Sequence, residues 1–151
     1  MQHDILEKVA EDLLFIPFLI SRGVRRRLFR STLDGFELDI TPLHCEVMGL
    51  IENEGPLHAA EIGERLEIAR AQMTQLIDKL ADLKLVQRKT DESDRRIINI
   101  ILTDMGKTVI EEHKERVINA IREHMSSLNK EDLEDLGNSL RKIRDILLKL
   151  Q

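Results

Sequence analysis

Two short stretches carry polar side chains whose types and spacing suggest a chemical task. The first, residues 70–75, begins with Arg-Ala-Gln and includes Thr74 and Gln75. The second, residues 91–96, reads Asp-Glu-Ser-Asp-Arg-Arg. A glutamine amide can form paired hydrogen bonds with the edge of adenine, and a guanidinium group suits phosphate. These side chains therefore suggest recognition of a nucleic acid rather than the making or breaking of bonds.

The surrounding elements would place these stretches on a helix and a hairpin. His58–Leu66 and Arg70–Leu83 have the apolar spacing of two helices joined by a turn at 67–69. Two strand-like segments, 85–89 and 97–102, flank the polar tip that holds the two arginines. The second helix of such a pair enters the major groove, and a hairpin beside it can reach the minor groove or phosphates. We therefore expect a protein that binds double-stranded DNA.

The expected DNA contacts come from the exposed half of the second helix and from the hairpin. Glutamines are candidates for base edges and alanine for a thymine methyl group, whereas cations and hydroxyls suit phosphates. The full set is Arg70, Ala71, Gln72, Thr74, Gln75, Lys79, Arg88, Lys89, Ser93, Arg95 and Arg96. Because side chains alternate along a strand, either Arg95 or Arg96 could face DNA while the other pairs with an aspartate. An ordinary solvated surface with exposed ion pairs is the alternative.

The order and spacing of the segments resemble the MarR family of winged-helix transcription regulators. The matching stretches include Ile-Thr-Pro-Leu-His at 40–44, Glu-Ile-Gly-Glu-Arg-Leu at 61–66, and Leu-Thr-Asp-Met-Gly-Lys at 102–107 after the hairpin. The resemblance implies a mainly α fold, a winged helix-turn-helix with a two-stranded β wing and a helical dimerisation lobe. It also implies a homodimeric repressor on a palindromic operator, released by a small effector. Lys84 and Ser93 depart from the family, which often has glycine and arginine there.

The 151 residues suit one interlocked domain. Residues 1–33 and 104–151 would form the dimerisation lobe, and residues 41–103 the DNA-binding lobe. Apolar stripes at steps of three and four would pack between two subunits, because a single chain would leave them in water. The residues of these stripes are Ile5, Val9, Leu13, Leu133, Leu136, Leu140, Ile143 and Leu147.

The net charge of −5 is unusual for a DNA-binding protein, but the charges are unevenly distributed. Residues 65–96 carry eight basic and six acidic side chains, and residues 21–33 carry five arginines and no acid. These arginines could approach phosphates, hold an acidic effector or pair with acids of a partner subunit. A solvated or intersubunit helix face is the simpler interpretation.

An effector pocket is expected between the two lobes. Its candidate residues are Phe18, Arg22, His44, Met48 and His113, with ordinary core or surface positions as the alternative. Cys45 is expected to be a buried thiol, because a redox switch needs an accessible thiolate. A metal site recruiting Cys45, Glu46, Glu112 and His113 is a weaker interpretation, because their spacing forms no compact metal motif.

Several classes of protein are not expected. The single cysteine fits a reducing cytoplasm, and the chain has no apolar run long enough for a membrane span. No catalytic set of residues can be named, so we expect no enzyme, no cofactor and no bound metal. The main alternative to a DNA-binding repressor is a winged-helix protein-interaction module, or an antirepressor, that does not read DNA itself.

Overall fold

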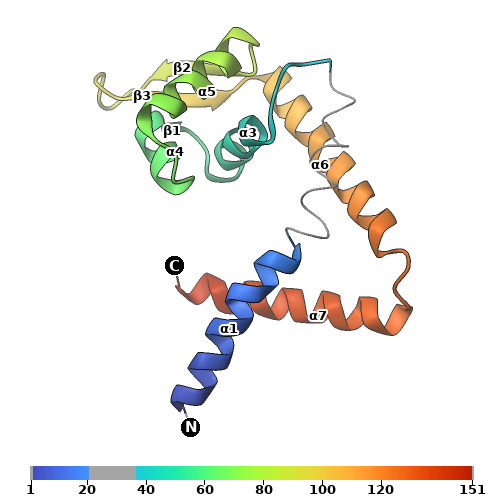
Figure 1. The fold of residues 1–151 in the computed structure, drawn as a ribbon. Helices are drawn as coiled ribbons and strands as arrows, with labels where there is room; N and C mark the ends of the chain where they lie inside the picture. The colour runs from blue at the N-terminus through green and yellow to red at the C-terminus, as the bar shows by residue number, and fades with distance from the viewer. Residues whose placement is uncertain (1, 21–36, 151) are drawn as a thin grey trace.

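The computed structural model describes residues 2–20 and 37–150. Helices dominate, and a small antiparallel sheet lies at one end of the molecule (Figure 1). The mainly α, winged helix-turn-helix fold class is confirmed. The elements are α1 (Gln2–Ile20), α3 (Pro42–Glu54), β1 (Leu57–His58), α4 (Ala59–Arg65), α5 (Arg70–Asp82), β2 (Val86–Thr90), β3 (Ile98–Leu102), α6 (Asp104–Met125), α7 (Lys130–Leu147) and the 3-10 turn η2 (Leu148–Leu150).

The sheet contains one strand more than the sequence indicates. The expected hairpin forms, with β2 and β3 paired from Val86 opposite Leu102 to Thr90 opposite Ile98. The short strand β1 adds to the other edge of β3, where Leu57 pairs with Ile100. Two residues are too few to show an alternating pattern, so sequence periodicity could not reveal this strand.

Capping side chains set where the helices begin. His58 accepts a hydrogen bond from the backbone N–H of Glu61, whose carboxylate accepts one from His58 N–H, and α4 follows. Thr103 caps α6 by accepting from Gly106 N–H, and Asn129 caps α7 by accepting from Asp132 N–H. Thr103 and Asn129 therefore each supply the side-chain cap at which their helix begins.

The angle between α4 and α5 depends on a close backbone contact. Glu67 adopts a left-handed conformation with φ of 53°, and Ile68 N–H donates to Gly63 O at 2.8 Å. A Cβ added at Gly63 would lie 3.1 Å from Ile68 O, so a larger side chain would push the turn outward. Lys84 is also left-handed, with φ of 58°, at the end of α5. Glycine suits such a conformation better than lysine does.

One hydrophobic core joins the elements from α3 to β3 and the first half of α6. We call this part of the molecule the winged-helix lobe. Its most buried large side chains come from every layer of the lobe: Val47, Met48, Ile62, Met73, Ile77, Leu80, Leu85 and Ile100. Each such side chain contributes about 1.5–3 kcal/mol by leaving water. The lobe is therefore a firm platform for the polar faces of α5 and the hairpin.

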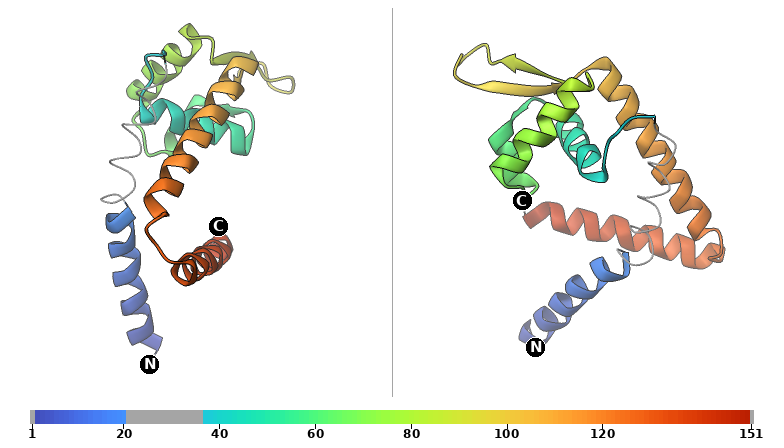
Figure 2. Two further views of the ribbon diagram at one scale, coloured as in Figure 1. Left: turned by 90° about the vertical axis from the view of Figure 1, so that its right-hand side faces the viewer. Right: turned by 45° about the horizontal axis from the view of Figure 1, so that its top comes forward.

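The terminal helices lie outside this core. Helix α6 leads away from the winged-helix lobe to α7, and α1 lies on the same side of the lobe as α7 (Figure 2). Helix α7 has no buried residue. No helix within residues 2–20 and 37–150 is long and apolar enough to cross a membrane.

Candidate nucleic-acid interface

Helix α5 separates an apolar face from a polar one. Its apolar face is buried and consists of Met73, Leu76, Ile77 and Leu80. The polar face of α5 has an outward line of four exposed residues, spaced by four, three and four positions: Ala71, Gln75, Asp78 and Asp82. The N-terminal half of this line is neutral and the C-terminal half is acidic. Only the N-terminal half therefore suits a polyanion.

The first turn of α5 adds to that preference. Arg70 and Gln72 are exposed, and Ala69 before them provides no side-chain cap. The free N–H groups of a helix N-terminus carry partial positive charge and attract phosphate. The Thr74 hydroxyl donates to Arg70 O at 3.1 Å, so it already has a partner inside the helix.

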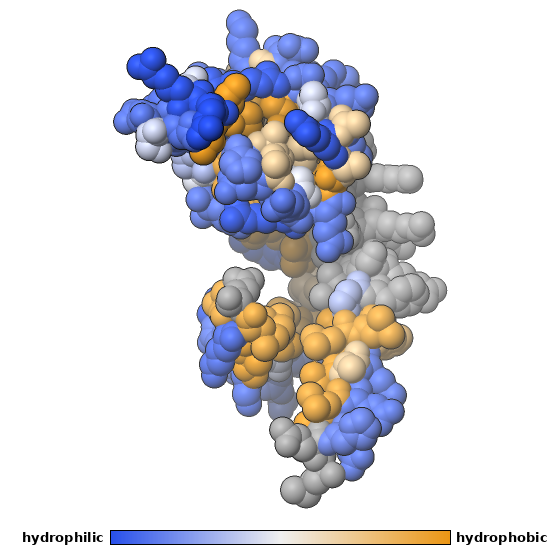
Figure 3. All heavy atoms as spheres, turned by 90° about the vertical axis from the view of Figure 1, so that its left-hand side faces the viewer, coloured by the Kyte–Doolittle hydropathy of each residue, from blue (hydrophilic) through white to orange (hydrophobic). Residues whose placement is uncertain are grey.

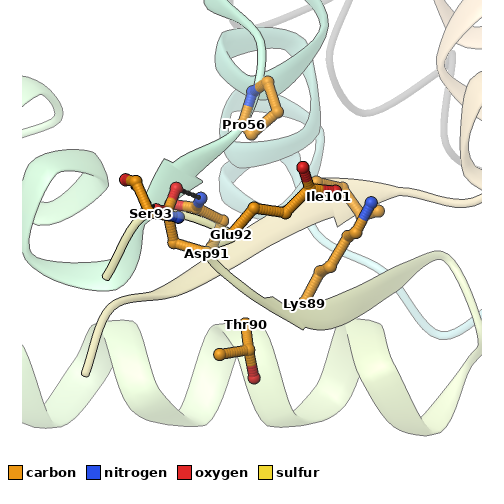
Figure 4. Close-up of a pocket in the computed structure, with 8 residues that line it drawn as sticks. Pro56, Lys89, Thr90, Asp91, Glu92, Ser93 and Ile101 are labelled. Atoms are coloured by element: carbon orange, nitrogen blue, oxygen red, sulfur yellow. Dashed lines mark hydrogen bonds between the residues drawn. The ribbon is translucent and has the colours of Figure 1, made fainter. Parts of the chain in front are cut away.

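The hairpin tip is closed by the carboxylate of Asp91 (Figure 4). Its Oδ1 accepts from the Ser93 hydroxyl at 2.5 Å, from Ser93 N–H at 2.8 Å and from Asp94 N–H at 3.0 Å. Its Oδ2 accepts from the Asn99 amide at 3.1 Å. These hydrogen bonds, the Ser93 hydroxyl first, lower the pKa of Asp91 to about 2. Ser93, expected to meet DNA, uses its hydroxyl to shape the tip.

The two arginines of the tip differ in their surroundings. Arg96 donates from Nε to Asp94 Oδ1 at 3.1 Å and from Nη2 to Asp94 Oδ2 at 3.0 Å. This paired contact lowers the pKa of Asp94 and raises the pKa of Arg96. Arg95 is exposed, and within the described residues it has no ion pair. Arg96 therefore has a fixed direction, whereas Arg95 extends freely into solvent.

Two further cations near α5 are held by carboxylates. Lys79 Nζ lies 2.6 Å from Asp39 Oδ2, in the segment that precedes α3. Arg88 on β2 forms an ion pair with Asp78 of α5. Lys89, the next residue, points away from Thr90, and Thr90 faces α5 (Figure 4). These ion pairs link residues that lie 40 and 10 positions apart, so no local sequence signal could have revealed them.

Comparison with known proteins places this geometry in a family. A model of the MarR family matches residues 38–97. The transcriptional repressor MdtR of Bacillus subtilis is 30% identical over 106 residues, which cover 70% of this chain and 68% of MdtR. The regulator SarZ of Staphylococcus aureus is 30% identical over 133 residues, or 88% of this chain and 86% of SarZ. The chain belongs to the MarR family. It is a helix-turn-helix transcription regulator and not an enzyme.

Solved MarR-family structures share the fold over nearly the whole chain. A MarR family protein from Bacillus stearothermophilus has a TM-score of 0.77 at 24% identity and covers 94% of this chain and 97% of its own. A MepR mutant of Staphylococcus aureus, solved bound to an oligodeoxyribonucleotide, has a TM-score of 0.63 at 24% identity and covers 92% and 98%. MarR-family regulators bind DNA, typically as dimers, and some bind small-molecule effectors.

The structure describes the side chains of three of the five residues expected around an effector pocket of this MarR-family chain, and all three are buried. Arg22 lies outside the described residues, and the side chain of Phe18 is not described. Met48 is fully buried in the core, and His44 and His113 are buried on α3 and α6. Burial lowers the pKa of both histidines, so both favour the neutral form. The His44 ring accepts from Thr41 N–H at 3.0 Å and so helps to start α3.

A hollow that the sequence did not indicate lies between α4 and α5. It measures about 730 Å³, and its lining consists of Ala59, Ala60, Gly63, Glu64, Glu67, Ile68, Ala69, Arg70, Met73 and Thr74. Small residues form much of this lining. They carry no distinctive spacing, so only the structure shows the hollow.

Cys45 is 4% exposed, and burial raises the pKa of its thiol to about 11, with the nearby Glu46 adding to the effect. Such a thiol is protonated at neutral pH and reacts slowly. Within the described residues, no group of three or more His, Cys, Asp or Glu is placed to hold a metal ion. The metal interpretation of Cys45, Glu46, Glu112 and His113 therefore has no support from the geometry.

The apolar stripes of the terminal helices remain in solvent. In α7, Leu133, Leu136, Leu140, Ile143 and Leu147 are between 37% and 50% exposed. In α1, Ile5, Val9 and Leu13 are between 46% and 59% exposed. Figure 3 shows apolar side chains gathered over both helices, below the mainly hydrophilic winged-helix lobe.

Proposed function

We propose that this MarR-family regulator acts in the cytoplasm as a homodimeric repressor that reads a palindromic operator and is released by a small effector. One observation carries the proposal. The winged-helix lobe, with α5 and the hairpin, lies at one end of the molecule, and α1 and α7 lie at the other (Figure 1). The first end exposes the polar face of α5, and the second exposes apolar stripes. Residues 41–103 would then read DNA, and residues 1–33 and 104–151 would join two subunits.

The homodimer follows from the free energy of exposed apolar surface. Water contact costs about 25 cal/mol for each Å² of apolar area, and α7 leaves its whole stripe in water. A second copy offers a matching stripe, and two-fold symmetry is the usual arrangement for identical subunits. It would also present a second α5, about 34 Å away and one DNA turn along. A two-fold dimer accounts for a palindromic operator.

Base recognition would come from the N-terminal half of α5. Gln72 and Gln75 have the donor and acceptor pair that matches adenine, and Ala71 can touch only a thymine methyl group. Arg70 and the helix N-terminus would hold a phosphate. In the wing, Asp94 fixes the direction of Arg96, which has N–H groups left over for DNA, and Arg95 reaches phosphate without a competing partner.

Release would work through the spacing of the two α5 helices. An effector that binds better to a dimer with the wrong spacing lowers DNA affinity by that difference in affinity. We place the effector site near α3 and α6, because α6 connects the winged-helix lobe to α7, and His44 and His113 are buried on these two helices. Phe18 and Arg22 stay candidates for this site on the basis of the sequence alone.

The second candidate function is a protein-interaction module or antirepressor with the same fold. The net charge of −5 favours it, as does the neutral Gln75 on the outward line of α5. Such a module would use α5 on a protein partner. Its binding would not depend on the release of counterions from DNA.

Selection from a pool of random duplexes separates the two candidates. A homodimeric reader enriches sites with two-fold symmetry, and its affinity falls by about 10³-fold or more between 50 and 200 mM salt if six or more phosphates are contacted. A pool that stays random, or an affinity that does not depend on salt, would contradict DNA reading and support the protein-interaction module.

A further inference from the structure

The C-terminal half of α5 is tied to two neighbouring elements. Lys79 forms its ion pair with Asp39, and Arg88 forms its ion pair with Asp78. We propose that Lys79 and Arg88 are positioning residues that hold the reading helix in place, and that neither contacts phosphate. The proposal rests on the DNA-reading function proposed above, and it reassigns two cations that the sequence suggested as phosphate contacts.

Each ion pair has an anchored partner. Asp39 directly precedes Ile40, which is buried in the core, and Ile40 N–H donates to Leu38 O at 2.9 Å. Arg88 lies on β2 directly opposite Ile100 of β3, and Ile100 is also buried in the core. Lys79 therefore connects α5 to the segment before α3, and Asp78 connects it to the wing. The helix is held from two directions at the end that does not meet bases.

The charge around this end of α5 opposes a phosphate. Lys79 and Arg88 are each already paired with a carboxylate, and Asp82 adds an exposed carboxylate on the outward side of this end of α5. A phosphate approaching Lys79 would have to displace Asp39 and pass near the outward carboxylates. At the other end of α5, Arg70 has no ion pair within the described residues, so a phosphate that binds there displaces no carboxylate.

The chain supplies matched controls for both residues. Arg70 is the control for Lys79, because both cations lie on α5. Lys89 is the control for Arg88, because the two are neighbours on β2 and point to opposite sides of the hairpin. Glu37 is the control for Asp39, because it is exposed in the same segment and carries the same charge.

The experiment measures operator affinity at several salt concentrations, using a duplex recovered by the selection above. Replacing a residue that contacts phosphate reduces the steepness of log affinity against log salt by about 0.9 per contact, or by about 1.8 for a dimer in which both copies make that contact. We expect that loss for Arg70→Gln and Lys89→Gln. For Lys79→Gln and Arg88→Gln we expect an unchanged slope with affinity lowered by about twofold to fivefold, the scale of an exposed ion pair.

Asp39→Asn separates the two roles of Lys79, because they predict changes of opposite sign in operator affinity. If Lys79 positions the helix, Asp39→Asn weakens binding by the same factor as Lys79→Gln, and the double variant is no worse than either single one. If Lys79 contacts phosphate, Asp39→Asn frees the lysine and tightens binding relative to Glu37→Gln. Tighter binding, or a slope that falls in Lys79→Gln, would overturn the positioning role. A wild-type protein with no salt-dependent DNA binding would overturn the proposed function itself, before any variant is compared.

Discussion

At the scale of single residues, the surroundings of each cation distinguish roles that the sequence cannot. Lys79, Arg88 and Arg96 all have carboxylate partners, whereas Arg95 has none within the described residues. Arg96 differs from the other two because its partner, Asp94, belongs to the same hairpin tip and is itself fixed by Asp91. Its ion pair therefore aims the guanidinium without tying it to another element.

Arg96→Ala should weaken operator binding by about tenfold or more, because it removes an aimed guanidinium from the wing. The dimer should stay folded, since Arg96 is exposed. Fluorescence anisotropy with a labelled operator measures the loss, and circular dichroism checks the fold. Arg96→Lys is the matched control, because lysine keeps the charge but cannot form the paired contact with Asp94. Binding by Arg96→Ala at wild-type strength would show that the wing has been placed wrongly on DNA.

At the scale of elements, local signals in the sequence predicted the helix-turn-helix pair and the hairpin. Thr103 and Asn129 mark helix starts because a single side chain provides the cap. Strand β1 was not predicted, because pairing with the distant strand β3 rather than a local preference selects it. The left-handed conformations of Glu67 and Lys84 were not predicted either, because neither residue is the glycine that usually marks such a helix end. The same holds for the interface: sequence indicates which side chains could meet DNA, but not which of them a distant aspartate already holds.

The start of α6 provides a stability test at this scale. A Cβ added at Gly106 would lie 2.0 Å from the backbone oxygen of Leu85, so α6 and the start of the wing would have to move apart. Gly106→Ala should therefore lower the free energy of unfolding by about 1–3 kcal/mol, as overpacking usually does.

Gly49→Ala is the control for Gly106→Ala. Gly49 lies inside α3, and nothing lies within 4 Å of an added Cβ. This change should raise the free energy of unfolding by about 0.5–1 kcal/mol, because alanine favours a helix interior over glycine. Urea unfolding followed by circular dichroism measures both variants. Equal effects of the two substitutions would contradict the close packing of α6 on Leu85.

At the scale of the whole molecule, the two ends of the chain have opposite surfaces. The winged-helix lobe has its own core, whereas α1 and α7 have apolar stripes and little to cover them within the described residues. A short helix gains little stability from its own propensity and depends on packing. The exposed stripes and the need for two reading helices therefore lead to the same requirement, a second subunit.

Leu140→Asp should separate the proposed dimer, because it places a charge in the middle of the α7 stripe, where Leu140 is 50% exposed in the single chain. Light scattering should give the mass of one chain. Operator affinity should fall by about 100-fold or more, because two linked half-site contacts become independent ones. Asn138→Asp adds the same charge on the other side of α7 and should leave both mass and affinity unchanged. If Leu140→Asp remained a dimer with full affinity, the α7 stripe would not form the subunit interface, and the pairing of the two reading helices would need another origin.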